Sequence, residues 1–135
     1  MTEPELKSAE ALKGKRGLRR LINATRYSWQ GSRAGFRNEA AFREECLLAI
    51  ILIPLALLLP VTLLEKVILI NSVLFLLLTE ILNSAIVAVV DRIGMEVHPL
   101  AGRAKDMGSA AVLFALIMGL VAWGFIALPA VFALF

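Results

Sequence analysis

Residues 67–90 read VILINSVLFLLLTEILNSAIVAVV, an apolar run that contains a single charged side chain, Glu80. A helix needs about 20 such residues to cross the hydrocarbon core of a bilayer. Similar uncharged runs lie on both sides of it, at 46–64 and 107–134. Because hydrocarbon offers no partner to unpaired backbone groups, the three runs predict three transmembrane helices in an all-α integral membrane protein.

The composition excludes an ordinary soluble domain, since 59% of the residues are hydrophobic and only 19% are charged. Residues 18–135 are predicted to form a single membrane domain. Within it, residues 18–37 alternate apolar and arginine side chains at helical spacing and predict an amphipathic helix at the membrane surface. Gly31 and Gly35 are expected to bend that helix or divide it in two. Residues 1–17 are expected to form a mobile cytoplasmic tail.

The charge distribution predicts the topology. Most of the basic residues precede the first apolar run, and the net charge is +3. By the positive-inside rule, the N-terminus and the 91–106 loop are cytoplasmic, and the Glu65-Lys66 link lies outside. Beside three membrane spans, the basic segment is expected to contact anionic headgroups or a polyphosphate, and no nucleic-acid partner is expected.

Glu80 is the most informative single residue. A carboxylate inside an apolar helix costs on the order of a few kcal/mol on insertion scales, so it must serve either a structural hydrogen bond or a function. Asn83, Val87 and Asp91 follow it at steps of three, four and four, which places all four side chains on one helix face. Three spans enclose little interior, so this face predicts a homo-oligomer with sites at subunit junctions.

Other charged residues lie near the predicted cytoplasmic ends of the spans. Glu39, Glu44 and Glu45 precede the first span, and Lys105 and Asp106 precede the third. Phosphoryl transfer needs carboxylates to hold Mg²⁺, a cation on the phosphates and a base near the acceptor hydroxyl. The residue types therefore fit a kinase. The sequence contains no P-loop and no protein-kinase glycine-rich loop, so a nucleotide site here needs another design.

Several segments carry a family resemblance across roughly residues 20–128. They are Tyr27-Ser28-Trp29, Asn38-Glu39-Ala40-Ala41-Phe42-Arg43, Glu80-Ile81-Leu82-Asn83-Ser84-Ala85-Ile86, Val90-Asp91-Arg92 and Gly102-Arg103-Ala104-Lys105-Asp106-Met107-Gly108-Ser109-Ala110-Ala111. In content and spacing they resemble the prokaryotic diacylglycerol kinase family. The resemblance implies a homotrimer in the bacterial inner membrane that transfers the γ-phosphate of MgATP to the hydroxyl of diacylglycerol, giving phosphatidic acid.

The resemblance also implies residue roles. Glu80 would be the catalytic base and Asn83 would orient it, while Glu39 would bind the metal. The nucleotide site would comprise Arg20, Tyr27, Glu39, Glu96, His98, Lys105 and Asp106, and the lipid site Ser28, Trp29, Arg33, Glu45 and Ser109. From the residues alone, His98 reads as an exposed loop residue, and Tyr27, Trp29 and Trp123 read as an aromatic belt at the headgroups.

One position departs from the family pattern, which has a second metal-binding Glu where this chain has Val87. A valine cannot bind Mg²⁺, so weakened activity is expected, with Asp91 as a candidate replacement one turn further on. Two alternatives stay open. The acceptor could be undecaprenol or another polyprenyl alcohol, or the chain could be a non-catalytic membrane relative in which Glu80 is structural.

Overall fold

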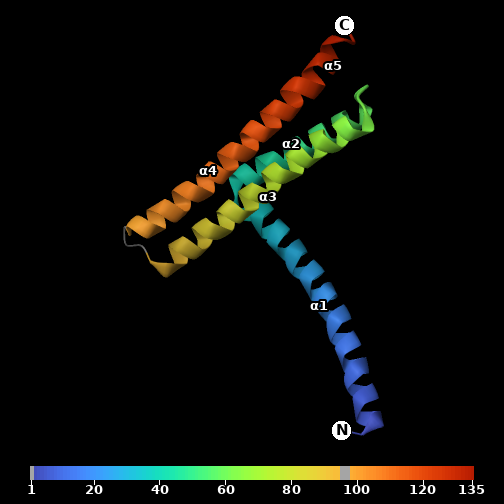
Figure 1. Cartoon of the computed structure of the whole chain (residues 1–135). Helices are drawn as coiled ribbons and strands as arrows, with labels where there is room; N and C mark the ends of the chain where they lie inside the picture. The colour runs from blue at the N-terminus through green and yellow to red at the C-terminus, as the bar shows by residue number, and fades with distance from the viewer. Residues whose placement is uncertain (1, 95–97) are drawn as a thin grey trace. The chain divides into compact units, whose positions relative to one another are not determined.

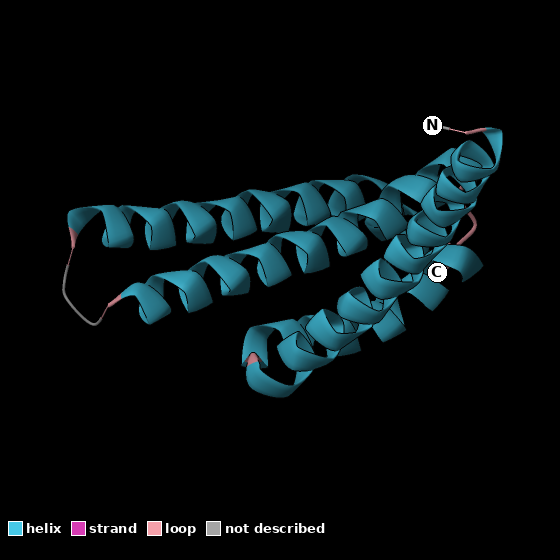
Figure 2. Ribbon diagram, turned by 90° about the horizontal axis from the view of Figure 1, so that it is seen from below, coloured by secondary structure: helices cyan, strands magenta, loops and turns pink. Residues whose placement is uncertain are grey.

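The computed structural model describes residues 2–94 and 98–135, and for residues 4–15 it describes the backbone alone. The elements, in chain order, are α1 (Glu3–Asn38), α2 (Ala40–Leu58), α3 (Leu63–Ile93), α4 (Pro99–Ala122), the π-helical segment η1 (Trp123–Ala127) and α5 (Leu128–Phe132) (Figure 1). No strand occurs in the described ranges (Figure 2). The all-α prediction is therefore confirmed for this part of the chain.

The chain divides into two compact units, Met1–Ala34 and Gly35–Phe135. In the first unit, α1 starts at Glu3 and continues without a break through Gly31. The sequence instead predicts a mobile tail up to residue 17 and a bend at Gly31 and Gly35. Ala, Leu, Glu and Lys dominate the segment after Pro4 and are strong helix formers, and a proline is tolerated in a first turn. The helix therefore begins well before residue 18.

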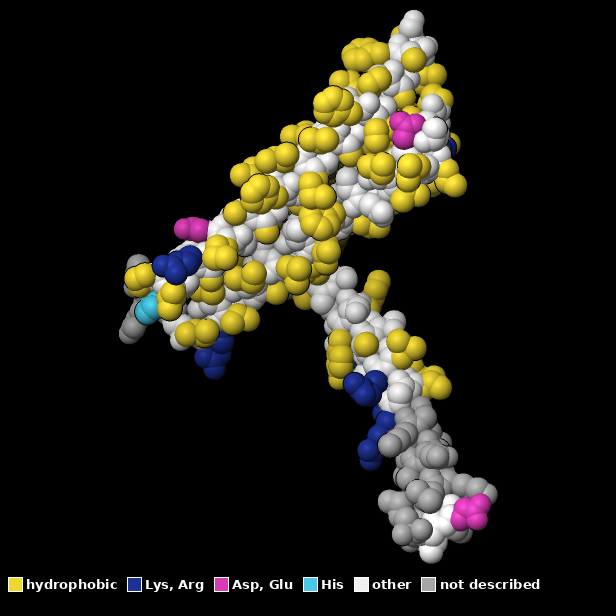
Figure 3. Space-filling view, viewed as in Figure 1, with side chains coloured by type: hydrophobic (Ala, Val, Ile, Leu, Met, Phe, Trp, Pro, Cys, Tyr) yellow, Lys and Arg dark blue, Asp and Glu magenta, His cyan; other side chains and the backbone are white. Residues whose placement is uncertain are grey.

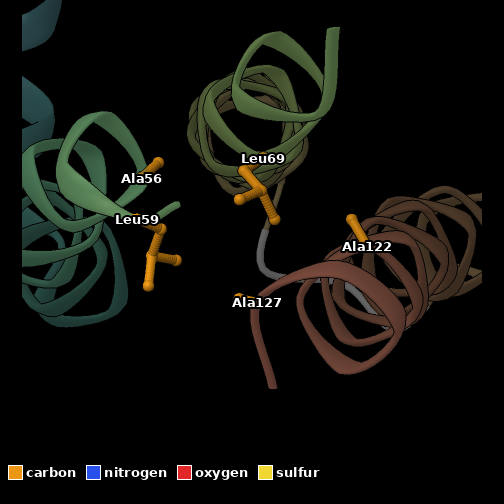
Figure 4. Close-up of a cluster of buried hydrophobic side chains, with 5 residues drawn as sticks. All are labelled: Ala56, Leu59, Leu69, Ala122 and Ala127. Carbon is orange, nitrogen blue, oxygen red and sulfur yellow. The ribbon is translucent and has the colours of Figure 1, made fainter. Parts of the chain in front are cut away.

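In the second unit, α3 packs against both α2 and α4. Near the ends of α2 and η1, this packing buries a cluster made of Ala56, Leu59, Leu69, Ala122 and Ala127 (Figure 4). Three of the five side chains are alanines. Small residues allow the helix backbones to approach closely, as is common between helices in membranes.

The first predicted span, 46–64, differs from the helices in the structure. α2 continues through Pro54 but ends at Leu58, and Leu59 is extended because it precedes Pro60. α3 then starts earlier than predicted, since the side chains of Thr62 and Glu65 each accept the other residue's backbone N–H in a capping box. The expected Glu65-Lys66 link is thus the first turn of α3, and the connection lies at 59–62.

The predicted 91–106 loop is also shorter in the structure. α3 ends at Ile93, and α4 begins at Pro99, which occupies the first helical turn. Pro99 therefore opens a helix, because a proline at the first position loses no intrahelical hydrogen bond. Gly102, expected in the turn, lies inside α4.

A π-helical segment interrupts the C-terminal helix between α4 and α5. There the Leu128 N–H donates to the Trp123 carbonyl, one residue further back than in an α-helix. Pro129 follows directly and has no N–H to donate, which accounts for the local change in hydrogen bonding. The Trp123 indole N–H donates to Ser72 Oγ at 3.1 Å, and both residues line an apolar cavity of about 240 Å³. Trp123 therefore contacts α3 through this hydrogen bond, whereas the sequence predicts a contact with lipid headgroups.

Two helical stretches are long and apolar enough to cross a membrane, Leu63–Ile93 and Pro99–Phe132. Few of their residues are buried, unlike those of a core helix in a soluble protein, and apolar side chains cover them in Figure 3. α2 carries Arg43, Glu44 and Glu45 in its first two turns, which leaves a shorter apolar stretch from Cys46 to Leu58. Its role as the third span stays a prediction.

Candidate active site

Glu80 lies within α3 and is one of the few charged residues withdrawn from the surface. Its relative exposure is 8%, whereas the neighbouring Leu78 and Leu82 are more than half exposed. Glu80 thus occupies the face of α3 that packs on other helices. A polar group on this face must find its partners within the protein, because lipid offers none.

Glu39 is positioned by the junction of α1 and α2. It is the N-cap of α2, with an extended backbone that separates the two helices. Arg43 fixes the junction by donating from Nε to the Phe36 carbonyl and from Nη2 to the Arg37 carbonyl, at 3.0 and 2.9 Å. These contacts satisfy the free carbonyls at the end of α1.

Gly35 allows the end of α1 to approach the rest of the second unit. A Cβ atom there would lie 3.1 Å from the ring of buried Phe42 and 3.5 Å from Ile81. Ile81 follows Glu80 directly, and Phe42 follows Glu39 by three residues. The close contact at Gly35 therefore brings Glu39 toward Glu80, and the two carboxylates lie within electrostatic range of each other.

Glu45, in the second turn of α2, adds a third carboxylate. Its Oε2 atom is buried and has no hydrogen-bond partner in the structure. Burial, and after it the charges of Glu80 and Glu44, raises the pKa of Glu45 to about 7. The Glu80 carboxylate therefore interacts electrostatically with two others, those of Glu39 and Glu45, and a cation bound beside it would offset this repulsion.

Asn83 lies on the same face of α3 as Glu80, one turn closer to the loop. Its Oδ1 atom is buried, accepts no hydrogen bond and lies directly against Gly108 of α4. Val87 continues this face and is half-buried, whereas Asp91 is exposed. The predicted face with Glu80, Asn83, Val87 and Asp91 is therefore helical throughout, and it becomes more exposed toward the loop.

The predicted phosphate-binding residue Lys105 lies on α4. Its ammonium is 2.7 Å from the Asp91 carboxylate of α3. Asp91, the candidate replacement for a glutamate at position 87, is thus paired with a cation in this structure. Asp106 and Ser109 are exposed on α4. His98 is the N-cap of α4, where its Nδ1 accepts the Leu100 N–H at 3.1 Å, and its side chain is exposed as the sequence suggested.

The remaining predicted site residues lie in the first unit or outside the described residues. Arg20, Tyr27, Ser28, Trp29 and Arg33 are all exposed on α1. The Ser28 hydroxyl donates to the Ala24 carbonyl at 2.8 Å, and the Arg26 guanidinium lies 5.4 Å from the centre of the Tyr27 ring. Glu96 falls in 95–97, outside the described residues. The residues brought together are those of the second unit.

The oxygen atoms of this site suit Mg²⁺, which prefers hard ligands. Two of them, Glu45 Oε2 and Asn83 Oδ1, are buried without a hydrogen-bond partner. Among the described residues, however, no three Asp, Glu, His or Cys side chains lie close enough to hold a metal ion. Since Mg²⁺ usually keeps waters and uses one or two carboxylates with substrate phosphates, the residues fit an ion that arrives with a nucleotide.

The sequence did not predict the close contacts at two glycines of this region, Gly35 and Gly108; for Gly35 it predicted a bend in the surface helix. Both lie inside helices, where a glycine is unfavourable by about 1 kcal/mol relative to alanine. A glycine inside a helix can mark a place where a neighbouring element packs closely. That signal was present in the sequence, but only the packing of the helices distinguishes these two from Gly102 and Gly119, which have open space around them.

The sequence pattern of prokaryotic diacylglycerol kinase matches residues 26–127. A protein of Haemophilus influenzae named diacylglycerol kinase is 54% identical over 108 residues, which cover 80% of this chain and 92% of the relative. Proteins of the same name are 53% identical in Escherichia coli K12, covering 79% and 88% of the two chains, and 50% identical in Pseudomonas aeruginosa, covering 90% and 98%. The apolar helices, the buried Glu80 carboxylate and these relatives agree, and the chain belongs to the prokaryotic diacylglycerol kinase family.

Proposed function

We propose that this membrane protein transfers the γ-phosphate of ATP to the hydroxyl of diacylglycerol and so produces phosphatidic acid. The names of its relatives support this acceptor, since the proteins of Haemophilus influenzae, Escherichia coli and Pseudomonas aeruginosa are all named diacylglycerol kinase. The observation that carries the proposal is the buried Glu80, whose carboxylate is close enough to those of Glu39 and Glu45 for their charges to interact. A carboxylate inside an apolar membrane helix is energetically costly, and such residues commonly mark functional sites.

Glu80 is the proposed general base. Its carboxylate would accept the proton of the lipid hydroxyl as the hydroxyl oxygen attacks the γ-phosphate, and ADP would leave with the bridging oxygen. Asn83, one turn away on the same helix face, would orient Glu80. Ser28, Trp29, Arg33, Glu45 and Ser109 are proposed to contact the lipid.

The nucleotide would bind at the loop end of α3 and α4. Lys105 would neutralise phosphate charge, and His98 and Asp106, together with Glu96 in the segment that is not described, are assigned to the same site. From the family resemblance, Arg20 and Tyr27 are also proposed to contact the nucleotide. Mg²⁺ would be held by Glu39 and the phosphates, and when bound it neutralises charge on the transferred group. With Val87 in place of a carboxylate, Glu39 would be its main protein ligand, and activity would be reduced.

The location and assembly are part of the proposal. The chain would lie in the bacterial inner membrane with its N-terminus in the cytoplasm, because its basic residues precede the first apolar run. It would act as a homotrimer with active sites shared between subunits. The described residues of one chain bring no three Asp, Glu, His or Cys side chains close enough to hold a metal ion, which supports sites that a partner subunit completes.

The decisive test is a kinase assay of the purified protein in mixed micelles with MgATP and either diacylglycerol or undecaprenol. Phosphate transfer to diacylglycerol is expected, and transfer to undecaprenol alone would establish the other acceptor. Glu80→Gln keeps the shape but cannot accept a proton, so it should lower kcat by about 10²–10⁴-fold. An unchanged rate in this variant would refute the base assignment, and no transfer to either lipid would refute the kinase function.

A further inference from the structure

Gly108 lies where α4 comes closest to the candidate base. It is buried, and both neighbours, Met107 and Ser109, are exposed. A Cβ atom at this position would collide with Asn83 Oδ1 and would lie 3.4 Å from Asn83 Cγ and 3.8 Å from its Cα. At Gly102 and Gly119 of the same helix, a Cβ would meet nothing within 4 Å. The close approach is therefore specific to Gly108.

We propose that Gly108 is a positioning residue, which sets the orientation of the Asn83 carboxamide and through it that of Glu80. The inference rests on the proposed function, in which Asn83 orients the base. The contribution of Gly108 is the absence of a side chain, which leaves space for the Asn83 oxygen against the α4 backbone.

The orientation of the carboxamide follows from which end faces Gly108. The buried Oδ1 has no hydrogen-bond partner, and one Cα–H bond of Gly108 points toward it, because a glycine hydrogen occupies the direction that a Cβ would take. Such Cα–H···O contacts recur where helices pack closely. With the oxygen held there, the amide N–H groups are the end available to a carboxylate.

A reversed carboxamide would present its oxygen to Glu80, and two acceptors would then face each other in a site with little water. A side chain at position 108 would displace the Asn83 oxygen and so remove the preference for the productive orientation. The base would still be present, but its direction toward the lipid hydroxyl would vary. We therefore expect a loss in kcat and little change in KM, because substrate contacts remain.

The test compares two single-methyl additions on one helix, Gly108→Ala and Gly119→Ala, in the full chain in mixed micelles with MgATP and diacylglycerol. Gly108→Ala should lower kcat by about tenfold or more, within the range of lost positioning interactions, with KM for ATP and lipid changed less than about twofold. Gly119→Ala should match the parent. Full activity in Gly108→Ala, or equal losses in both variants, would overturn the proposal.

A double variant distinguishes positioning from general damage to packing. If Gly108 acts through Asn83, then Gly108→Ala should lower kcat no further once Asn83 is already alanine. Additive losses would overturn the proposal. If Gly108→Ala alone fails to fold, shortening residue 83 in the double variant should restore folding, because it removes the atoms that collide. A double variant as unstable as the single one would also contradict the inference.

A measurement without turnover separates this inference from the proposed kinase function. The side-chain amide NMR signal of Asn83 can be identified by its loss in Asn83→Ala. It should shift in Gly108→Ala and stay in place in Gly119→Ala. An inactive parent protein would refute the proposed function and leave this comparison intact, whereas an unshifted signal in Gly108→Ala would refute the role of Gly108 in an active enzyme.

Discussion

The Lys105 ammonium lies 2.7 Å from the Asp91 carboxylate and joins the last turn of α3 to the second turn of α4. Both side chains are partly exposed, at 42% and 61%. Exposed ion pairs of this kind contribute about 0–1 kcal/mol to stability. The pair therefore contributes little to the stability of the fold, and its main effect is to hold the Lys105 charge beside Asp91.

Asp91→Asn should release Lys105 for the proposed phosphate contact. Removing an anion that competes with the polyphosphate should lower the KM for ATP by severalfold, on the order of the 0–1 kcal/mol of an exposed pair, without lowering kcat. The effect should weaken as salt is added, because salt screens exposed charges. Steady-state kinetics at two ionic strengths measure this. A higher Mg²⁺ requirement in Asp91→Asn would instead identify Asp91 as the replacement metal ligand.

Val87→Glu should restore a carboxylate one turn beyond Asn83 on the active-site face of α3. The Mg²⁺ concentration for half-maximal activity should fall by about tenfold, and kcat should rise, because a second hard ligand is added. Val87→Gln is the matched control, since it has the same length without the charge. Equal behaviour of the two variants would show that position 87 does not bind the metal.

The sequence predicted the all-α membrane class because apolar runs and the cost of unpaired backbone groups leave few other choices. It misplaced the helix boundaries because those depend on local contacts. Leu59 is extended before Pro60, the Thr62–Glu65 capping box moves the start of α3 ahead of residue 67, and Pro99 opens a helix. Composition alone does not distinguish these arrangements from ordinary turns.

The candidate site was predictable in its residue types and not in its geometry. Glu80 stands out in sequence because a charge in an apolar helix is rare. That Glu45 shares its surroundings, and that Gly108 faces Asn83, depends on how α2 and α4 pack on α3. The binding roles of Glu96 and of the predicted residues on α1 stay predictions.

The raised pKa of Glu45 predicts a pH-dependent stability. Its folded-state pKa of about 7 lies above the ordinary value of 4.5 for a glutamate, mainly because burial disfavours the charged form. Between these values the folded chain holds a proton that the unfolded chain has lost, so stability should fall as pH rises from about 4.5 to about 7 and then level off. Thermal unfolding in micelles at several pH values measures this trend.

Glu45→Gln should remove that part of the pH dependence, because an amide does not titrate. The variant should unfold at a higher temperature than the parent at pH 8, and the two should converge near pH 4.5, the ordinary pKa of a glutamate. Glu44→Gln is the control, since Glu44 is exposed and makes the smallest of the three contributions to the Glu45 pKa. A parallel pH profile in Glu45→Gln would contradict the assignment to Glu45.

The Trp123–Ser72 hydrogen bond should stabilise the α3–η1 contact without affecting catalysis. The distance from Trp123 Nε1 to Ser72 Oγ is 3.1 Å, and Trp123 is half-buried while Ser72 is buried. Ser72 Oγ also donates to the Leu69 carbonyl at 2.7 Å. Interhelical hydrogen bonds in membrane proteins contribute about 0.6 kcal/mol on average. A double-mutant cycle with Trp123→Phe and Ser72→Ala should return a coupling free energy of that order in reversible unfolding, while kcat stays at the parent value. A coupling free energy near zero would show that packing alone holds η1 on α3. A fall in kcat in either single variant would show that this contact supports the active site, which lies several turns away along α3.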